Sequence, residues 1–281
     1  MSGFESRGAQ TGYRGARAWL PQHDPAAAST LAAGGADCDP PEDWADRSPV
    51  WPDPVAAAQA IPAGRLPFNL NADAVLSYTV INGPAGQVLQ STGSLRPEPL
   101  TDQHAQELGD AFVAAYDWMR WQMHRHILGY TGGFPLWVWA RTTRRDLVST
   151  AQDMARESPG SVLICLRIPR TQLLLTDYFT WHDVLNGSPA VPVDCVGCGT
   201  RHCDDAECWD RWFDGWFDEW GAQIPPADDG ARLPWWCWPP DLQTRLFASW
   251  EAVHSLRRRF PVQGCVERIE YAWVQAIRPL R

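Results

Sequence analysis

Four cysteines lie close together along the chain, at Cys195, Cys198, Cys203 and Cys208, with two, four and four residues between them. Four thiolates at such spacings can reach one tetrahedral centre, and an all-cysteine set is a common structural zinc site. Zinc fits better than an iron–sulfur cluster, because nothing else in the sequence indicates redox chemistry. The sequence therefore predicts one structural zinc ion held by these cysteines.

Two alternatives stay open for this cluster. His202 or Cys237 can replace one of the four ligands, or the four thiols can stay free in a loop. The spacing, with Gly199 directly after the second cysteine, resembles the retroviral-type zinc knuckle, although Cys203 stands where that family has a histidine. The loop is acidic, which repels phosphate and favours a structural staple over a nucleic-acid reader: Asp204, Asp205 and Glu207.

A second group of chemically capable residues lies upstream. Asp177 and His182 stand at the start of a predicted helix, where a carboxylate can fix the tautomer of an imidazole for acid–base work. Arg141 and Arg144 follow a tryptophan-rich strand and can clamp a diphosphate. Each has a plainer interpretation, with Asp177 as a helix N-cap, His182 as a satisfied buried imidazole and the arginines as solvated surface groups.

Tryptophan is concentrated in one region, with seven of the 17 residues between positions 209 and 238. Trp209, Trp212, Trp216 and Trp220 recur at spacings of three and four, as on one side of a helix. Such a stripe can stack a planar ligand such as a base or nicotinamide. Because aromatic stripes at helical spacing are mostly core, we favour packing or a protein interface.

The bulk composition narrows the function classes. The chain has 281 residues, 45% of them hydrophobic, and a net charge of −9. This acidity disfavours duplex DNA as a partner, because DNA binding needs many cations. No stretch approaches the roughly 20 apolar residues that a membrane span needs, and the N-terminus lacks the pattern of a signal peptide. We expect a cytoplasmic protein with no membrane association.

The pattern along the chain separates two parts. Residues 1–70 are rich in Pro, Ala and Gly and are predicted to form a flexible arm, part of which we expect to lie against the body or a partner. Residues 71–281 mix strand and helix signals without a βαβ rhythm. We predict an α+β domain with a mixed central sheet, flanking helices and a zinc-binding, tryptophan-rich insertion at about 187–240.

The elements that must position these residues can be placed from periodicity. Apolar runs predict strands, and spacings of three and four predict helices. The predicted strands are 76–81, 136–141, 161–168, 173–175 and 261–269, and the predicted helices are 101–128, 178–185, 209–220, 241–259 and a short one ending near Gly93.

Several segments of the chain match a known pattern, among them Ala115-Tyr116-Asp117-Trp118-Met119, Leu174-Leu175-Thr176-Asp177 and Trp181-His182 followed by Val184-Leu185-Asn186. Through these, residues 76–277 resemble an uncharacterised bacterial domain-of-unknown-function family. The resemblance implies a fold neighbourhood without a defined activity. It also implies that the cysteine loop is an insertion after Asn186.

A more distant similarity is to the ADP-ribosyltransferase fold, through a first strand, a helix and a Gly93-Ser94-Leu95 turn, with Gln263 in the final strand. Thr79 stands where that fold has His or Arg, and Cys265 stands where an acid follows the Gln. The carboxylate would therefore come from Glu267, Asp177 or Asp146.

This similarity implies an NAD-dependent enzyme that transfers ADP-ribose to a macromolecule or to water. The candidate catalytic residues are Glu267, Gln263 and Asp177, with His182 added by its spacing from Asp177. The candidate NAD-binding residues are Tyr78, Thr79, Trp137, Arg141 and Arg144. The alternative is a non-catalytic, zinc-stapled module that holds a protein partner through the arm and the tryptophan helix, in a phage or host-defence setting. A nucleic-acid reader through the knuckle is the third candidate.

Overall fold

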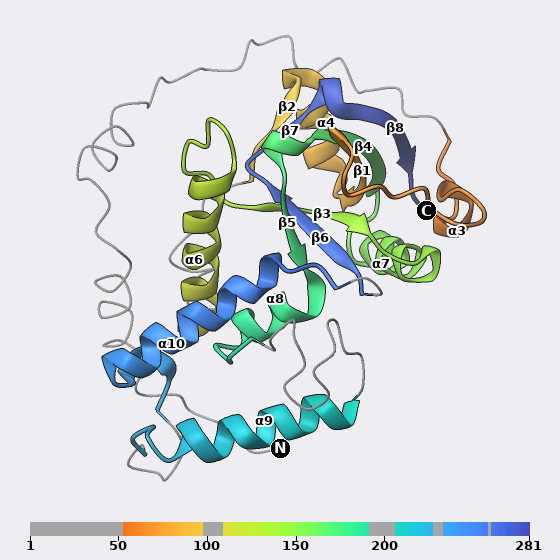
Figure 1. Cartoon of the computed structure of the whole chain (residues 1–281). Coiled ribbons are helices and arrows are strands. Elements are labelled where there is room, and N and C mark those ends of the chain that lie inside the picture. The colour runs from red at the N-terminus through yellow and green to blue at the C-terminus, as the bar shows by residue number, and fades with distance from the viewer. Residues whose placement is uncertain (1–52, 98–108, 191–205, 227–232, 258–259) are drawn as a thin grey trace, which may run out of the picture. The chain divides into compact units, whose positions relative to one another are not determined.

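The computed structural model describes residues 53–97, 109–190, 206–226, 233–257 and 260–281 (Figure 1). In these residues a six-stranded sheet is flanked by helices, which confirms the α+β prediction. Its five strand pairings are all antiparallel, so the prediction of a mixed sheet was wrong. None of the helices described is both long and apolar enough to cross a membrane.

The large sheet has the strand order β5-β6-β3-β1-β4-β8. The strands are β1 (Ala74–Ile81), β3 (Leu136–Arg141), β4 (Val162–Pro169), β5 (Leu174–Asp177), β6 (Val262–Val266) and β8 (Val274–Pro279). A smaller sheet pairs β2 (Ser94–Leu95) with β7 (Ile269–Glu270). Every predicted strand is present, although the last one is divided into β6 and β7.

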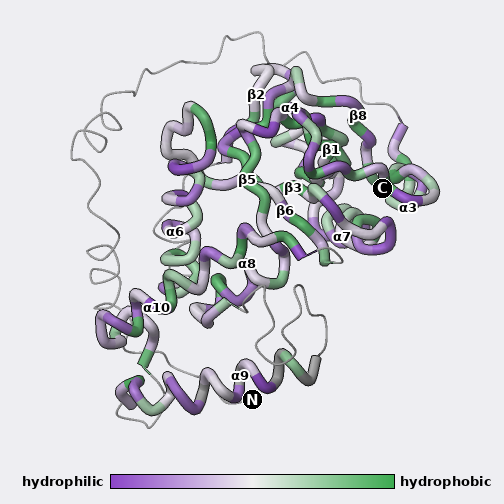
Figure 2. The backbone as a smooth tube through the Cα atoms, viewed as in Figure 1, coloured by the Kyte–Doolittle hydropathy of each residue, from purple (hydrophilic) through white to green (hydrophobic). Residues whose placement is uncertain are grey.

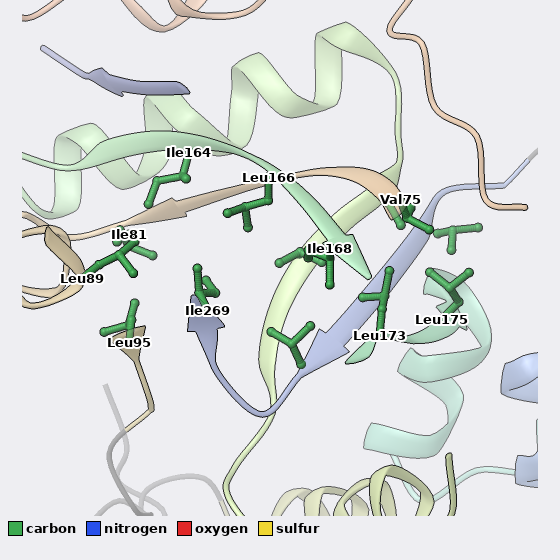
Figure 3. Packing of buried hydrophobic residues seen from close by; sticks show 14 of the residues in the cluster. Val75, Ile81, Leu89, Leu95, Ile164, Leu166, Ile168, Leu173, Leu175 and Ile269 are labelled. Carbon is green, nitrogen blue, oxygen red and sulfur yellow. The ribbon is translucent and has the colours of Figure 1, made fainter. Parts of the chain in front are cut away.

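One face of the large sheet packs against α4 (Gly83–Thr92). Ile164, Leu166 and Ile168 alternate along β4 and point into this core, to which Leu89 of α4 also belongs (Figure 3). Gly93 ends the helix with a left-handed φ of 79°, a conformation that glycine adopts without strain. The start of β4 is apolar on both faces because this core covers one face, while Leu163 and Cys165 on the other face belong to a second core.

The opposite face is covered in part by α7 (Arg144–Glu157) and α3 (Ala57–Ala60). Leu147, Ala151 and Ala155 recur every four residues and pack on Tyr78 and other residues of this face. Backbone pairing joins Val55 to Leu280. Residues 53–70, predicted to belong to the arm, therefore pack on the body, whereas residues 1–52 lie outside the part described.

Three further helices bury aromatic and sulfur-containing side chains. They are α6 (Asp110–His126), α8 (Tyr178–Leu185) and α10 (Pro240–Trp250), and α10 continues as the turn η5 (Glu251–His254). Met119, Met123 and Ile127 are buried. The rings of Trp118 on α6 and Trp250 on α10 meet edge to face at 5.6 Å. Residues 101–108 of the predicted first helix lie outside the described residues.

The tryptophan-rich segment forms α9 (Ala206–Gly221), in agreement with the predicted helix. In Figure 2 much of the sheet is green, with purple stretches in β8, whereas α9 mixes purple, pale and green along its length. Trp220 is buried and Trp212 and Trp216 are half-buried, while Asp214, Asp218 and Glu219 are exposed. The helix therefore has an aromatic side and an acidic side.

Candidate functional site

Three of the predicted site residues lie on one face of the sheet: Tyr78, Trp137 and Gln263. Tyr78 on β1 lies opposite Trp139 on β3, and Trp139 lies opposite Gln263 on β6. Trp137 is two residues from Trp139 and points the same way. Thr79 points to the other face, where its hydroxyl donates to the carbonyl of Trp137 at 3.0 Å. Tyr78 and Thr79 therefore cannot flank the same ligand.

Tyr78 belongs to the core of this face. Its side chain is buried and meets the ring of Phe68 edge to face at 5.8 Å. Burial, together with the neighbouring thiol of Cys165, raises the pKa of Tyr78 to about 12. Trp137 is similarly engaged, because its ring lies 5.0 Å from Trp181 and its Nε1 donates to the Tyr116 hydroxyl at 3.2 Å.

Asp177 is the N-cap of α8 and half of a buried ion pair. Its Oδ1 accepts from the backbone N–H of Thr180 at 3.1 Å, as predicted for an N-cap. Nη2 of Arg257 lies 2.5 Å from the same oxygen, and both side chains are buried. His182, by contrast, is exposed, and its Nδ1 lies 2.8 Å from the carbonyl oxygen of Tyr178. The side chains of Asp177 and His182 therefore have different partners.

The two predicted phosphate-binding arginines both donate to backbone carbonyls. Nε of Arg141 donates to Phe260 at 3.0 Å, and burial lowers the pKa of Arg141, an effect that the charge of Asp177 opposes. Arg144 donates to Pro62 at 3.1 Å and to Ala58 at 2.5 Å. Arg144 thus ties the segment that contains α3 to the start of α7.

Glu267 holds the loop between α6 and β3. Its Oε1 accepts from the backbone N–H groups of Thr131 and Gly133, each at 3.0 Å, and from the Thr131 hydroxyl at 2.5 Å. Burial alone would raise the pKa of Glu267, but these hydrogen bonds and the charge of Arg96 outweigh it and lower that pKa. A Cβ at Gly133 would lie 2.8 Å from Cγ of Glu267, so this loop fits closely around the carboxylate.

Of the four predicted zinc ligands, Cys195, Cys198 and Cys203 lie outside the described residues. Cys208 is in the first turns of α9 and is buried, with Nη2 of Arg211 3.2 Å from its sulfur. Within the described residues no three His, Cys, Asp or Glu side chains group to hold a metal ion. The zinc prediction thus stays a prediction.

A pocket of about 480 Å³ lies along α9. Seven of its lining residues come from α9 and one from α10: Cys208, Arg211, Trp212, Gly215, Trp216, Glu219, Trp220 and Arg245. Because residues four apart are neighbours on a helix surface, two parallel lines form the wall. One line is aromatic, with Trp212, Trp216 and Trp220, and the other runs from Arg211 through Gly215 to Glu219.

Gly215 leaves the middle of the second line open. A Cβ built at Gly215 would meet nothing within 4 Å. No neighbouring atom therefore requires glycine here, and glycine inside a helix costs about 0.5–1 kcal/mol relative to alanine. The residue opens the pocket at the expense of helix stability.

Arg245 closes the pocket on the α10 side. Its guanidinium carbon lies 4.4 Å from the ring centre of Trp220, and its Nη2 lies 2.6 Å from Oε1 of Glu219. Exposed ion pairs of this kind contribute about 0–1 kcal/mol, so a ligand can displace Arg245 at low cost. The wall behind is firmer, because Trp216 packs 6.3 Å from Trp238, whose Nε1 donates to Leu233 at 2.7 Å.

The pocket can receive a side chain. Apart from Cys208 and Glu219, its walls are mainly indole rings and guanidinium groups, which contact aromatic and aliphatic groups through large, rigid surfaces. The Trp stripe was predicted from the sequence, whereas Gly215 and Arg245 were not. The signal for Gly215 was in the sequence, since a glycine flanked by Arg211 and Glu219 at helical spacing interrupts an otherwise strong helix.

Part of the chain is similar to a known protein family. Residues 78–189 match the family model described as "Domain of unknown function (DUF3841)". This confirms the predicted resemblance to an uncharacterised domain family over those residues. No curated protein and no solved structure matches the chain. The matched segment runs from β1 through α8, and α9 lies outside it.

Proposed function

We propose that this chain is a non-catalytic protein-interaction module that receives a partner's side chain in the pocket of α9. The observation that carries this proposal is the open floor at Gly215, between a line of tryptophans and Arg245. Buried pockets lined by Trp and Arg are where the strongest anchors of protein interfaces sit. The half-buried Trp212 and Trp216 supply such a surface with little conformational freedom to lose.

The surroundings of the charged residues support a binding role over catalysis. Asp177 is neutralised by Arg257, Glu267 accepts three hydrogen bonds from one loop, and Arg141 donates to backbone carbonyls. Groups engaged in this way stabilise the fold. They would have to leave these partners before they could act on a substrate.

The proposal includes one structural zinc ion held by Cys195, Cys198, Cys203 and Cys208. Cys208 fits this role, because a thiolate is favoured near a helix N-terminus and beside the guanidinium of Arg211. Zinc content measured on the purified chain tests it. We expect bound zinc in wild type and in Cys165→Ser, and its loss in Cys198→Ser. Equal zinc content in both variants would remove the ion from the proposal.

Quantitative capture from an extract of the source cells tests the binding function. Immobilised wild-type chain is compared with Gly215→Leu, which fills the pocket, and with Ala248→Leu, which adds the same side chain at an exposed α10 position outside it. We expect a protein that wild type and Ala248→Leu retain and that Gly215→Leu retains about tenfold less, a loss of roughly 1.4 kcal/mol. Identical proteins retained in equal amounts by all three would contradict the proposal.

An NAD-dependent enzyme of ADP-ribosyltransferase type is the second candidate. It is supported by the order of β1, α4 and the Gly93–Leu95 turn, and by the shared row of Tyr78, Trp139 and Gln263 on adjacent strands. In this candidate Gln263 contacts the ribose, and the acceptor is a macromolecule. Labelled NAD incubated with the chain and cell extract tests it. Label transfer that Gln263→Ala abolishes would favour it, and absence of both NAD binding and turnover would reject it.

A further inference from the structure

We infer that the partner of the α9 pocket carries Lys or Arg residues beside an aromatic or aliphatic anchor side chain. The inference rests on the proposed function, because it concerns the surface that surrounds the same pocket. Asp214 and Asp218 form the acidic line of α9, which borders the Gly215 line on the side away from the tryptophans.

Asp214 and Asp218 are four residues apart and therefore lie on one line of the helix. Asp218 is also three residues from Gly215, so this line lies next to the Arg211–Gly215–Glu219 line on the helix surface, just outside the lining of the pocket. Both side chains are exposed, and neither forms an ion pair among the residues that the structure describes. Glu219 differs from them, because it is already paired with Arg245.

The charges decide between classes of ligand. Asp214 and Asp218 repel phosphates and acidic peptides, and the net charge of −9 adds to that repulsion at long range. Arg211 and Arg245 in the pocket lining oppose this repulsion, although Arg245 is paired with Glu219. A metal ion is not favoured, because the described residues offer no third acidic, His or Cys ligand here. A basic protein segment is attracted by the carboxylates of Asp214 and Asp218.

The anchor and the charges have separate tasks. Burial of an apolar side chain against Trp212 and Trp216 supplies most of the affinity. Each exposed pair with Asp214 or Asp218 adds about 0.2–1 kcal/mol and mainly affects selectivity and the rate of association. The recognised motif is therefore an aromatic or large aliphatic residue with Lys or Arg close to it in the partner's sequence.

A display library of short random peptides, selected on the full-length chain, tests this motif. We expect enriched peptides to contain an aromatic or large aliphatic residue next to Lys or Arg, and to lose binding to Gly215→Leu. Binding to the double variant Asp214→Asn/Asp218→Asn should be about three- to tenfold weaker and less sensitive to salt. The control Asp73→Asn/Glu157→Gln removes two exposed acids elsewhere and should bind like wild type.

Two results separate the inference from the proposed function. Enriched peptides that need an open Gly215 but show no preference for Lys or Arg, and bind the double Asn variant equally, would overturn the inference and leave the pocket's function standing. Selection that gives no peptide sensitive to Gly215→Leu would contradict the proposed function itself, and the inference with it.

Discussion

Arg257 and Asp177 form an ion pair whose two side chains are only 4% and 0% exposed. The pair joins the residues after η5 to the end of β5 and the start of α8. Thr180 completes it, with its hydroxyl 3.0 Å from Nη2 of Arg257. Because the pair is shielded from water, loss of either charge leaves the other buried without compensation.

Asp177→Asn should therefore cost about 3–5 kcal/mol of unfolding free energy. Asp153→Asn is the matched control, since Asp153 pairs with Arg156 but is 53% exposed. We expect the control to change stability by less than about 0.5 kcal/mol. Urea denaturation of both variants measures the difference, and equal midpoints would contradict this account of the pair.

Glu267→Gln tests whether the Glu267 carboxylate stabilises the loop at residues 131–133. The variant removes a charge that accepts three hydrogen bonds, so we expect a loss of about 1.5–3 kcal/mol. Glu270→Gln, in a partly exposed pair with Arg268, should lose no more than about 1 kcal/mol. Thermal unfolding compares the two. A stable Glu267→Gln protein would show that the loop does not depend on this charge.

Ser77 and Ser161 are both fully buried but differ in their hydrogen bonds. The Ser77 hydroxyl finds no partner among the described residues, whereas that of Ser161 donates to the carbonyl of Ser158 at 2.6 Å. A buried hydroxyl without a partner is a cost. We expect Ser77→Ala to leave stability unchanged or to raise it by up to about 1 kcal/mol, and Ser161→Ala to lower it by about 1 kcal/mol. Denaturant midpoints that rank the two the other way would be evidence against this assignment.

His254 should make stability depend on pH. Burial is the main cause of its lowered pKa, and His126 and Arg125 act in the same direction against a bond to Leu175 and the charge of Glu251. As the pH falls below about 6.5, His254 is protonated in the unfolded chain but stays neutral in the folded protein. The free energy of unfolding therefore declines until the pH reaches the folded pKa of His254.

Urea denaturation between pH 7.5 and pH 5 measures this decline. His254→Gln should lose part of the slope in that range. Identical slopes in wild type and His254→Gln would mean that His254 titrates alike in both states.

Much of the fold was predictable because its strands are apolar runs bounded by turn residues. The N-cap at Asp177 and the stop at Gly93 also followed from local chemistry. Helix α7 was missed. Its buried side includes Ala151 and Ala155, which give a weak hydrophobic signal in a polar segment, although Thr143 caps its start.

The candidate site was predictable only in part, because contacts between distant segments decide it. The tryptophan stripe follows from spacing, but the pocket also needs Arg245 from α10 and open space at Gly215. In the same way, Glu267 was a candidate acid through the resemblance to the ADP-ribosyltransferase fold, and Asp177 through its spacing from His182. Their partners Thr131 and Arg257 come from far along the chain, and those partners give each acid a structural role.

The most direct test of the binding function is Gly215→Ala, measured for unfolding free energy and for affinity toward the captured partner. Alanine should raise stability by about 0.5–1 kcal/mol, because it favours the helix and meets no neighbouring atom. It should at the same time weaken binding by about tenfold, because its methyl group occupies the floor of the pocket. A more stable protein with weaker binding is the predicted result, and a more stable protein with unchanged affinity would contradict the role of the α9 pocket.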